Sequence, residues 1–417
     1  MIRLRVKNFG PIRKGMTTND RWIEFKRVTI FVGNQGSGKS TLAKLFSTFS
    51  WIEKALVRGD YDKKWFERKN RLSNQFLTYH RLENYFSPDT PDEAEIEYEG
   101  DAFSIKYSHG QLRITALNEQ HYALPQVMYV PAERNFIAYV RHPKELKLSS
   151  DALKEFLAEF DNAKNSMKGT LKLPINNTEL EYDKLNDILN IRDNAYKLRL
   201  TDASSGFQSA VPLYLVSHYL AHTIQSNKNT NQEPMSSDEL ERFRKGVAQI
   251  FSNVSLTQEQ QRAALSVLSS KFNKTAFINI VEEPEQNLYP LSQWKVLQSL
   301  LMFNNKDPFN RLVLTTHSPY IVNYLSIAVQ GELLHKKILN RASNVDLLSK
   351  LEALIPLTAL VSPDELAIYQ SDEITGSIIK LEALDGIPAD ENYLNNFLRE
   401  GNFIFDKLLE LEEELDQ

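Results

Sequence analysis

The chain has 417 residues, enough for roughly two or three domain-sized units with a large hydrophobic core. It has no cysteine, which excludes disulfides, cysteine-ligated metal centres and thiol nucleophiles. No apolar run approaches the roughly 20 residues of a membrane span, and the first residues alternate like a strand instead of forming a signal peptide. We therefore expect a cytoplasmic protein that does not enter the membrane.

The formal net charge of −5 is unevenly distributed along the chain. Residues 1–72 contain 17 basic and 6 acidic side chains, whereas residues 372–417 contain 3 basic and 13 acidic ones. The excess of basic side chains in residues 1–72 favours contact with polyanions. The acidic residues 372–417 are a candidate surface for self-association or for a partner.

Strands and helices alternate along most of the chain. Short apolar or alternating runs predict strands at 2–8, 28–32, 94–98, 103–107, 112–115, 127–130, 276–281 and 311–315. Helical patterns are predicted at 40–49, from 132 to about 200, at 210–224, 238–251 and 257–272, and from 317 to the end, with a polar loop at 226–237. This alternation predicts an α/β fold with a mixed sheet, and the meander at 94–115 predicts an antiparallel β lobe.

A glycine-rich motif joins the strand predicted at 28–32 to the helix predicted at 40–49. Its residues are Gly33, Asn34, Gln35, Gly36, Ser37, Gly38, Lys39, Ser40 and Thr41, which fit the pattern Gly-x-x-x-x-Gly-Lys-Ser/Thr. Glycines let the backbone N–H groups of such a loop, and the helix N-terminus behind it, surround a phosphate chain. Lys39 is predicted to reach the β- and γ-phosphates of a nucleotide, and the Ser40 hydroxyl to bind Mg²⁺.

Two adjacent carboxylates, Glu282 and Glu283, follow the apolar strand predicted at 276–281. Ligands bind at the carboxyl ends of strands in open α/β sheets, so both side chains are candidates for nucleotide chemistry. Adjacent residues of a strand face opposite ways, and the two carboxylates can therefore hold different roles. One would orient the water shell of Mg²⁺, and the other would polarise the attacking water.

Two further polar segments each carry a structural and a functional interpretation. The segment 204–208 precedes a predicted helix, and Ser205 would serve either as its N-cap or as part of a phosphate clamp. His317 follows the strand predicted at 311–315, where it would be either structural or a hydrogen-bond partner of the γ-phosphate.

Taken in order, the four motifs at 33–41, 204–208, 282–290 and 315–320 resemble those of ATP-binding-cassette ATPases, specifically the SMC/RecF/OLD-like branch. The resemblance implies a P-loop NTPase fold of ABC type, with an antiparallel β lobe and a helical lobe that carries the signature motif. It implies ATP and Mg²⁺ as cofactors, with two ATP molecules sandwiched in a head-to-tail dimer or a higher homo-oligomer. Residues 287–290 would form the dimer-interface loop.

The resemblance also implies roles for single residues. Ser205, Gly206 and Gln208 would belong to the signature that completes the partner's ATP site. Glu283 would be the catalytic glutamate, Glu282 a metal-site residue and His317 the switch histidine.

The chain departs from the family pattern at three places. Phe207 stands where the family has a second signature glycine, and Glu282 stands where it has an aspartate. No glutamine ends the strand at 127–130, where 131–134 reads Pro-Ala-Glu-Arg, so the glutamine-loop role is unassigned. Similar Pro-Ala-Glu-Arg and Ser-Ser-Gly-Phe-Gln motifs occur in stand-alone ATPases of anti-phage systems, such as the ATPase subunits of the Septu and PARIS systems.

We predict four regions: 1–135, the N-terminal half of the ATPase core with the phosphate loop and the β lobe; 136–275, a helical lobe with the signature; 276–330, the C-terminal half of the core; and 331–417, a helical acidic extension.

No toprim nuclease motif follows His317. His218 and His222 have a metal-compatible spacing but no carboxylate ligand nearby, so we expect packing. Basic and aromatic residues mix over 58–81, which favours either nucleic-acid contact or a partly packed surface helix.

These features lead to two main functional hypotheses. The first is an ATPase (ATP and water to ADP and phosphate) that associates around ATP and acts as the sensor or regulatory subunit of a separate effector, such as a nuclease, in bacterial anti-phage defence. The second is a RecF-like DNA-binding ATPase of recombination or repair. A transporter's nucleotide-binding subunit is a weaker third hypothesis, because the chain lacks a clear glutamine loop.

Overall fold

The computed structural model describes residues 1–87, 93–117, 122–140, 147–148, 150–230, 237–252, 268, 274–340, 345–384, 386–388 and 393–415. Its centre is a seven-stranded sheet of order β2-β16-β15-β4-β14-β13-β8. The strands are β2 (Gly15–Met16), β4 (Val28–Gly33), β8 (Pro125–Val130), β13 (Ala276–Glu282), β14 (Arg311–Thr316), β15 (Leu366–Ser371) and β16 (Ser377–Lys380). Strands β8, β13, β14, β4 and β15 are parallel to one another, so their carboxyl ends share one edge of the sheet.

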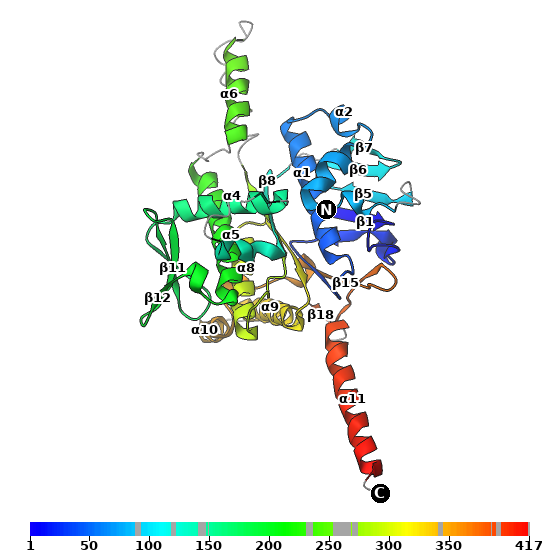
Figure 1. Cartoon of the computed structure of the whole chain (residues 1–417), viewed down its shortest axis with the longest axis vertical. Helices are drawn as coiled ribbons and strands as arrows, with labels where there is room; N and C mark the ends of the chain where they lie inside the picture. The colour runs from blue at the N-terminus through cyan, green and yellow to red at the C-terminus, as the bar shows by residue number, and fades with distance from the viewer. Residues whose placement is uncertain are drawn as a thin grey trace.

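One face of the central sheet is covered by α1 (Lys39–Arg58) and by a five-stranded antiparallel lobe of order β3-β1-β5-β6-β7 (Figure 1). The lobe consists of β1 (Ile2–Lys7), β3 (Ile23–Phe25), β5 (Glu95–Glu99), β6 (Phe103–Ser108) and β7 (Gln111–Ala116). A single apolar cluster joins its buried residues to α1 and to alternate residues of the central strands, such as Phe31 and Ile280. The predicted antiparallel lobe is confirmed, and it includes the N-terminal strand.

A buried carboxylate attaches this lobe to the helix that follows the phosphate loop. Glu53 of α1 accepts hydrogen bonds from the Tyr98 hydroxyl (2.8 Å), from the Ala102 N–H (2.7 Å) and from the Phe103 N–H (3.0 Å). A Cβ at Gly100 would lie 2.1 Å from the Glu53 carboxylate, so any larger residue there would displace this carboxylate. Burial raises the pKa of Glu53 to about 7.

The opposite face of the sheet carries a mainly helical layer. It contains α3 (Asn135–Tyr139), α4 (Asp151–Ser166), α5 (Ser205–Thr230), α8 (Pro290–Asn304) and α9 (Pro319–Leu339). Their buried side chains form a second apolar cluster with the other set of alternate strand residues, among them Ile30 and Val281. Burial on both faces explains why the central strands read as short, nearly continuous apolar runs in the sequence.

The lobe at 136–275 is less helical than predicted, because its middle is a second antiparallel sheet of order β12-β11-β10-β9. These strands are β9 (Thr170–Lys172), β10 (Glu179–Asp183), β11 (Ile188–Arg192) and β12 (Lys197–Arg199). One face of this sheet is buried and carries residues such as Leu180 and Ile191, whereas charged side chains cover the other face. The residue pattern of strands this short and polar is similar to that of a solvent-exposed helix. Helix α5 also continues to Thr230, into the predicted loop, and the stretch predicted as a helix at 257–272 lies outside the described residues except for 268.

The prediction of a purely helical extension at 331–417 is wrong. β15 enters the central sheet and pairs with β4 in parallel, and β16 pairs with β15 in the antiparallel sense. The strand Leu366–Ser371 is a short apolar run within an acidic region, and such runs are ambiguous between helix and strand. The C-terminal segment is therefore part of the central sheet.

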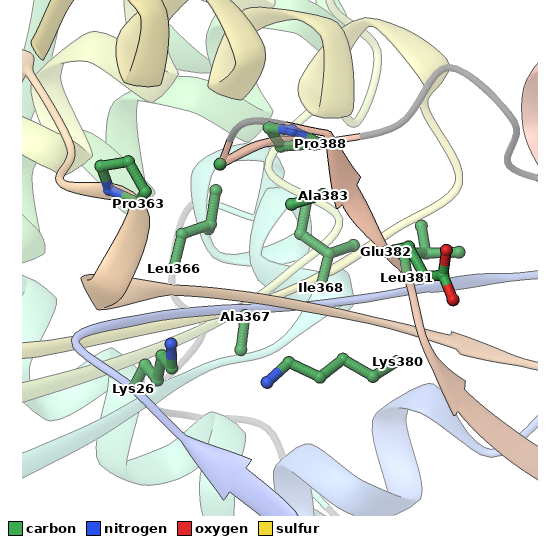
Figure 2. Close-up of a pocket in the computed structure, with 11 residues that line it drawn as sticks. Lys26, Pro363, Leu366, Ala367, Ile368, Lys380, Leu381, Glu382, Ala383 and Pro388 are labelled. Carbon is green, nitrogen blue, oxygen red and sulfur yellow. The ribbon is translucent and has the colours of Figure 1, made fainter. Parts of the chain in front are cut away.

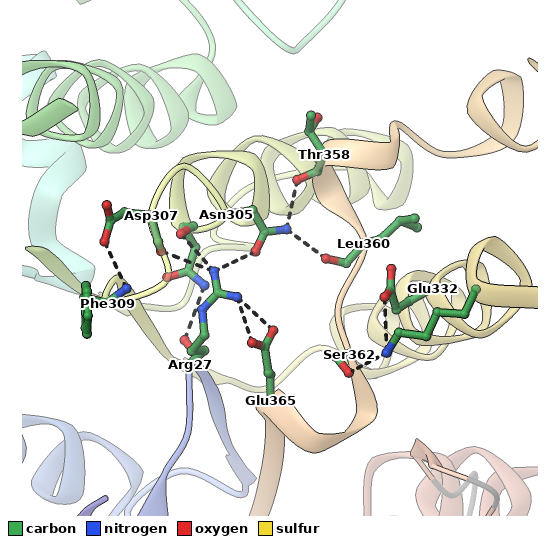
Figure 3. Close-up of polar contacts among 11 residues, drawn as sticks. Arg27, Asn305, Asp307, Phe309, Glu332, Thr358, Leu360, Ser362 and Glu365 are labelled. Carbon is green, nitrogen blue, oxygen red and sulfur yellow. Dashed lines mark hydrogen bonds and ion pairs between the residues drawn. The ribbon is translucent and has the colours of Figure 1, made fainter. Parts of the chain in front are cut away.

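A polar network fastens this segment to the opposite end of β4 from the phosphate loop (Figure 3). The Arg27 guanidinium donates to both oxygens of Glu365, over 2.9 and 2.8 Å, and to Asn305 Oδ1 over 3.3 Å. The Asn305 amide in turn donates to the carbonyl oxygens of Thr358 (2.9 Å) and Leu360 (2.8 Å). The network thus joins three segments that are far apart in the sequence.

Two helices extend away from the body in Figure 1, namely α6 (Ser237–Ser252) and α11 (Tyr393–Leu415). Exposed apolar side chains on α11 include Phe403, Phe405 and Leu408. Helix α10 (Val345–Leu354) packs beside α9 instead. None of the helices among the described residues combines the length and apolar character needed to cross a membrane.

Candidate functional site

The glycine-rich motif forms a loop between β4 and α1, as predicted. Gly33 ends β4 with φ 146°, and Gly38 precedes α1 with φ 98°. A Cβ at Gly33 would lie 2.4 Å from the Ser371 carbonyl oxygen, and one at Gly38 would lie 2.9 Å from the Ile12 side chain. Both positions therefore require glycine for space as well as for backbone conformation. The loop residues between them expose Asn34, Gln35 and Gly36.

Lys39, the first residue of α1, curls its side chain over the loop. Its Nζ donates to the carbonyl oxygens of Gly33 (2.9 Å) and Asn34 (2.7 Å). Burial lowers the pKa of Lys39 to about 8, and four surrounding carboxylates oppose this shift: Glu283, Glu285, Glu373 and Glu282. The ammonium group thus lies inside an acidic ring at the carboxyl edge of the sheet.

Glu282, the last residue of β13, meets the requirements for a metal-site residue. Its side chain is buried, one carboxylate oxygen accepts from the Ala132 N–H over 3.2 Å, and the other has no donor within hydrogen-bond distance, although the buried Tyr129 hydroxyl approaches the carboxylate. An unpaired buried carboxylate oxygen is costly unless a cation or water satisfies it. Mg²⁺ is usually held by one or two protein groups together with waters and phosphates, so Glu282 and the Ser40 hydroxyl suit it. Across the described ranges, no three His, Asp or Glu side chains form a ready-made metal cluster.

Glu283 has a strained backbone and a half-exposed carboxylate. Its φ of 44° is uncommon outside glycine, and its N–H donates to the Thr315 carbonyl oxygen of the neighbouring strand over 2.8 Å. Its Oε1 lies 3.7 Å from His317 Nε2. Burial and the Lys39 charge lower the pKa of His317, while a hydrogen bond to the Gly33 backbone raises it. The structure therefore brings Glu283 and His317 together beside the phosphate loop.

Glu285 also supports this edge, although the sequence assigned it no role. Its Oε1 accepts from the Thr316 hydroxyl (2.8 Å) and from the His317 N–H (2.7 Å), which fixes the start of the segment after β14. Burial raises the pKa of Glu285. Its place two residues after Glu283 is typical of a solvated helix start, so nothing in the sequence distinguished it.

The signature segment 204–208 lies at the N-terminus of α5. Ser204 and Ser205 are exposed, and the helix begins at Ser205. Gln208 is buried instead, and its side-chain amide donates to the Thr201 carbonyl oxygen over 3.0 Å. This bond gives Gln208 a role in shaping the turn, whereas the two serines are open to a ligand.

The predicted interface loop at 287–290 packs against the start of α5. The Asn287 amide donates to Ser209 Oγ over 3.2 Å, and a Cβ at Gly206 would lie 2.9 Å from the Asn287 carbonyl oxygen. Asn287 has a positive φ of 59°, and Tyr289 is 77% exposed. The loop therefore supports the signature helix within the chain and presents an aromatic side chain outward.

Arg134 lies at the end of the strand where the glutamine-loop role stayed unassigned. Its side chain is completely buried, and its guanidinium contacts the carbonyl oxygens of Glu282 (2.7 Å) and Glu283 (2.6 Å). Burial lowers the pKa of Arg134 to about 10, so it remains charged at neutral pH. The available sequence signal was a basic residue four positions after a buried strand, beyond the carboxyl edge of the sheet.

The C-terminal segment also reaches the phosphate loop. The Asn34 amide donates to Glu373 Oε1 over 2.9 Å, and Glu373 follows β15 by two residues. The position of the acidic C-terminal region in the sequence indicated that it lies apart from the phosphate loop. The structure instead places Glu373 of this region in contact with the loop.

The remaining sequence candidates have packed environments. His222 Nδ1 lies 2.7 Å from the His218 carbonyl oxygen, and both rings pack against Phe303. Burial lowers the pKa of both histidines, and both also line a pocket of about 540 Å³. In the basic and aromatic segment, Trp65 stacks on Tyr61 with ring centroids 4.2 Å apart, and the Arg71 guanidinium lies over Trp65.

A cavity of about 450 Å³ lies elsewhere, between β15 and the segment 380–388 (Figure 2). Lys26 and Lys380 extend toward each other below Ala367 in Figure 2. None of the predicted site residues lines this cavity. The phosphate loop and the acidic end of β13 therefore lie outside this pocket.

Together, the parallel strands of the central sheet, the glycine-rich loop between β4 and α1 and the antiparallel lobe give the chain a mixed α/β fold, as predicted.

Comparisons with known proteins give distant structural likenesses only. No family model and no curated protein matches the chain. The SMC head domain from Thermotoga maritima is similar over 92% of this chain and 98% of its own, with 12% identity and a TM-score of 0.35. A nucleotide-free ATP-binding cassette from an ABC transporter is similar over 93% of each chain, with 11% identity and a TM-score of 0.29. At this level of likeness, the function must be inferred from the chain's own residues.

Proposed function

We propose that this protein is an ABC-type ATPase that binds ATP with Mg²⁺ and hydrolyses it. The observation that carries the proposal is the convergence of four groups at one sheet edge: the phosphate loop, Glu282, Glu283 and His317. A phosphate loop alone would support binding, whereas a half-exposed carboxylate beside it supports activation of a water molecule.

Each residue would have a defined task. The N–H groups of residues 34–39 would surround the phosphates, and Lys39 would leave its loop carbonyls to contact the β- and γ-phosphates. Ser40 and Glu282 would hold Mg²⁺, which neutralises phosphate charge when bound. Glu283 would orient and polarise the attacking water, and His317 would contact the γ-phosphate from the neighbouring strand.

The site would be completed by a second copy of the chain. Ser204 and Ser205 are exposed at the N-terminus of a 26-residue helix, where N–H groups and the helix dipole favour an anion. Tyr289 is exposed in the adjacent loop. In a head-to-tail dimer, Ser205 and Gly206 of one copy would close over the nucleotide of the other, with Gln208 shaping the turn behind them.

The hydrolysis cycle would regulate a separate effector, such as a nuclease, in bacterial anti-phage defence. This finer assignment follows the motif resemblance. The exposed apolar residues of α11 offer a place for such a partner. The alternative, a RecF-like DNA-binding ATPase, is favoured by the exposed basic residues Lys64, Arg68 and Lys69.

A steady-state assay of phosphate release by the full-length chain, with and without Mg²⁺, tests the core proposal. We expect Mg²⁺-dependent hydrolysis of ATP that Glu283→Gln reduces at least 100-fold while ATP binding persists. Hydrolysis by Glu283→Gln at the wild-type rate would contradict the assigned water-activating residue. Absence of ATP binding in calorimetry would overturn the function as a whole. Co-purification with the product of an adjacent gene, identified by mass spectrometry, tests the effector assignment.

A further inference from the structure

We propose that Arg134 is a positioning residue that couples the backbone of Glu283 to the signature helix α5 of the same chain. The inference rests on the proposed ATPase function. It adds a residue with no sequence-assigned role and a route by which one nucleotide site would sense the other.

The Arg134 guanidinium contacts three separate segments through main-chain oxygens only. Its Nε donates to the Ser209 carbonyl over 3.0 Å, and its Nη2 donates to the Glu283 carbonyl over 2.6 Å. Its Nη1 donates to the carbonyls of Glu282 (2.7 Å) and Pro131 (3.3 Å). Backbone acceptors fix the path of the chain itself, and side-chain rotation cannot relax such contacts. The side chain has no exposed surface, so water does not compete for these bonds.

The contact to Glu283 stabilises a backbone conformation that costs energy. Its φ of 44° is sustained from two sides, by the N–H bond to Thr315 and by the bond from Arg134 to its carbonyl oxygen. Rotation of either peptide would redirect the Glu283 carboxylate away from His317. The guanidinium therefore helps to set where the water-activating carboxylate lies.

The contact to Ser209 extends the same guanidinium to the signature. Ser209 lies four residues after Ser205, one helical turn along α5. Ser209 is fully buried, and its hydroxyl also accepts from Asn287. A shift of the helix start, as Ser205 closes on a phosphate, would thus be transmitted to the peptide after Glu283.

In the proposed head-to-tail dimer, this connection links the two nucleotide sites. The signature of one chain closes over the partner's nucleotide, whereas Glu283 of that chain serves its own. When the signature of one chain closes over the partner's nucleotide, Arg134 would then transmit the shift of α5 to the Glu283 carboxylate at the other nucleotide site. The expected consequence is positive cooperativity of hydrolysis with respect to ATP.

A lysine at position 134 provides the sharpest test. It keeps the charge, but a single ammonium group cannot reproduce the planar fork that spans three segments. For Arg134→Lys we expect ATP affinity within 3-fold of wild type by calorimetry, kcat reduced at least 10-fold, and a Hill coefficient reduced to 1. Combined with Glu283→Gln, the substitution should cause no further loss, because both changes remove the same function.

The matched control is Arg27→Lys, which weakens a comparable arginine network at the opposite end of β4. It should lower the melting temperature while leaving kcat and the Hill coefficient at wild-type values. An Arg134→Lys protein with the wild-type kcat and Hill coefficient would overturn the coupling while leaving the ATPase proposal intact. A further loss of activity on the Glu283→Gln background would also overturn it. A wild-type chain that does not hydrolyse ATP would overturn both proposals.

Discussion

His317 Nε2 lies 3.7 Å from Glu283 Oε1, across the ends of the neighbouring strands β14 and β13. The two residues are 34 positions apart in sequence, and parallel pairing of their strands places them at the same sheet edge. Because Lys39 lies within electrostatic reach of both, the three side chains define the reacting end of the proposed nucleotide site.

Replacing Glu283 with glutamine removes the base but keeps the size of the side chain. We expect Glu283→Gln to bind ATP, to hydrolyse it at least 100-fold more slowly, and to accumulate as an ATP-bound dimer. Phosphate release and light scattering in the presence of ATP measure these effects. Glu352→Gln, an exposed substitution on α10, should behave as wild type.

Replacing Lys39 with alanine removes the cation at the centre of the loop. We expect Lys39→Ala to abolish ATP binding in calorimetry, because no other cation in the loop can contact the phosphates. Lys295→Ala, on the exposed surface of α8, is the matched control and should retain wild-type affinity. Undiminished affinity in Lys39→Ala would contradict the phosphate-loop assignment.

A bulky side chain at Ser205 should block closure without disturbing the fold, because Ser205 is exposed in the single chain. We expect Ser205→Tyr to bind ATP yet to remain monomeric when ATP is added, whereas the wild-type chain doubles its mass. Light scattering with and without ATP gives the result. An ATP-dependent increase in mass for Ser205→Tyr equal to that of wild type would exclude the signature as the dimer contact.

The exposed basic residues at 64–69 provide the test for DNA. If the chain binds single-stranded DNA through them, affinity should fall steeply with salt, and Lys64→Gln, Arg68→Gln and Lys69→Gln together should reduce the slope of log K against log salt by about 2. Fluorescence anisotropy at several salt concentrations measures this slope. Absence of DNA binding at low salt would contradict the DNA-binding hypothesis, and the effector hypothesis would then be the one that remains.

Glu53 should make stability depend on pH. Its pKa is about 7 in the folded protein and about 4.5 when unfolded, so the folded state holds the proton more tightly between these values. The contribution of Glu53 to the stability of the folded protein is therefore fully present below pH 4.5, and it is lost as the pH rises through 7. We expect Glu53→Gln to gain about 3 kcal/mol relative to wild type between pH 4.5 and 8, measured by urea unfolding. A difference that does not change with pH would contradict the buried carboxylate.

The sequence predicted the parts of the site whose residue types are chemically distinctive. The phosphate loop, the carboxylates after β13 and the histidine after β14 are polar groups that follow apolar strands, and parallel pairing brings such groups together. The β lobe was also predictable, because turn residues separate its strands and apolar and polar residues alternate along them.

The parts that escaped prediction depend on pairings far apart in the sequence. β15 pairs with β4 across more than 330 residues, and Glu373 contacts Asn34 because of that pairing. Arg134 donates to backbone oxygens only, and no side-chain pattern records such acceptors. The strands at 170–199 bury only one narrow face, so their periodicity is weak.

The order of the central sheet has a consequence for synthesis on the ribosome. The two neighbours of β4, namely β14 and β15, are translated roughly 280 and 340 residues after it, and at about 5–20 residues per second the second delay is about 17–70 s. Both edges of β4 stay unpaired until β14 has been made, and one edge stays unpaired until β15 has been made, which is a condition for misassembly. The phosphate loop, which follows β4 directly, therefore has its full set of neighbouring strands only after Ser371 has been synthesised.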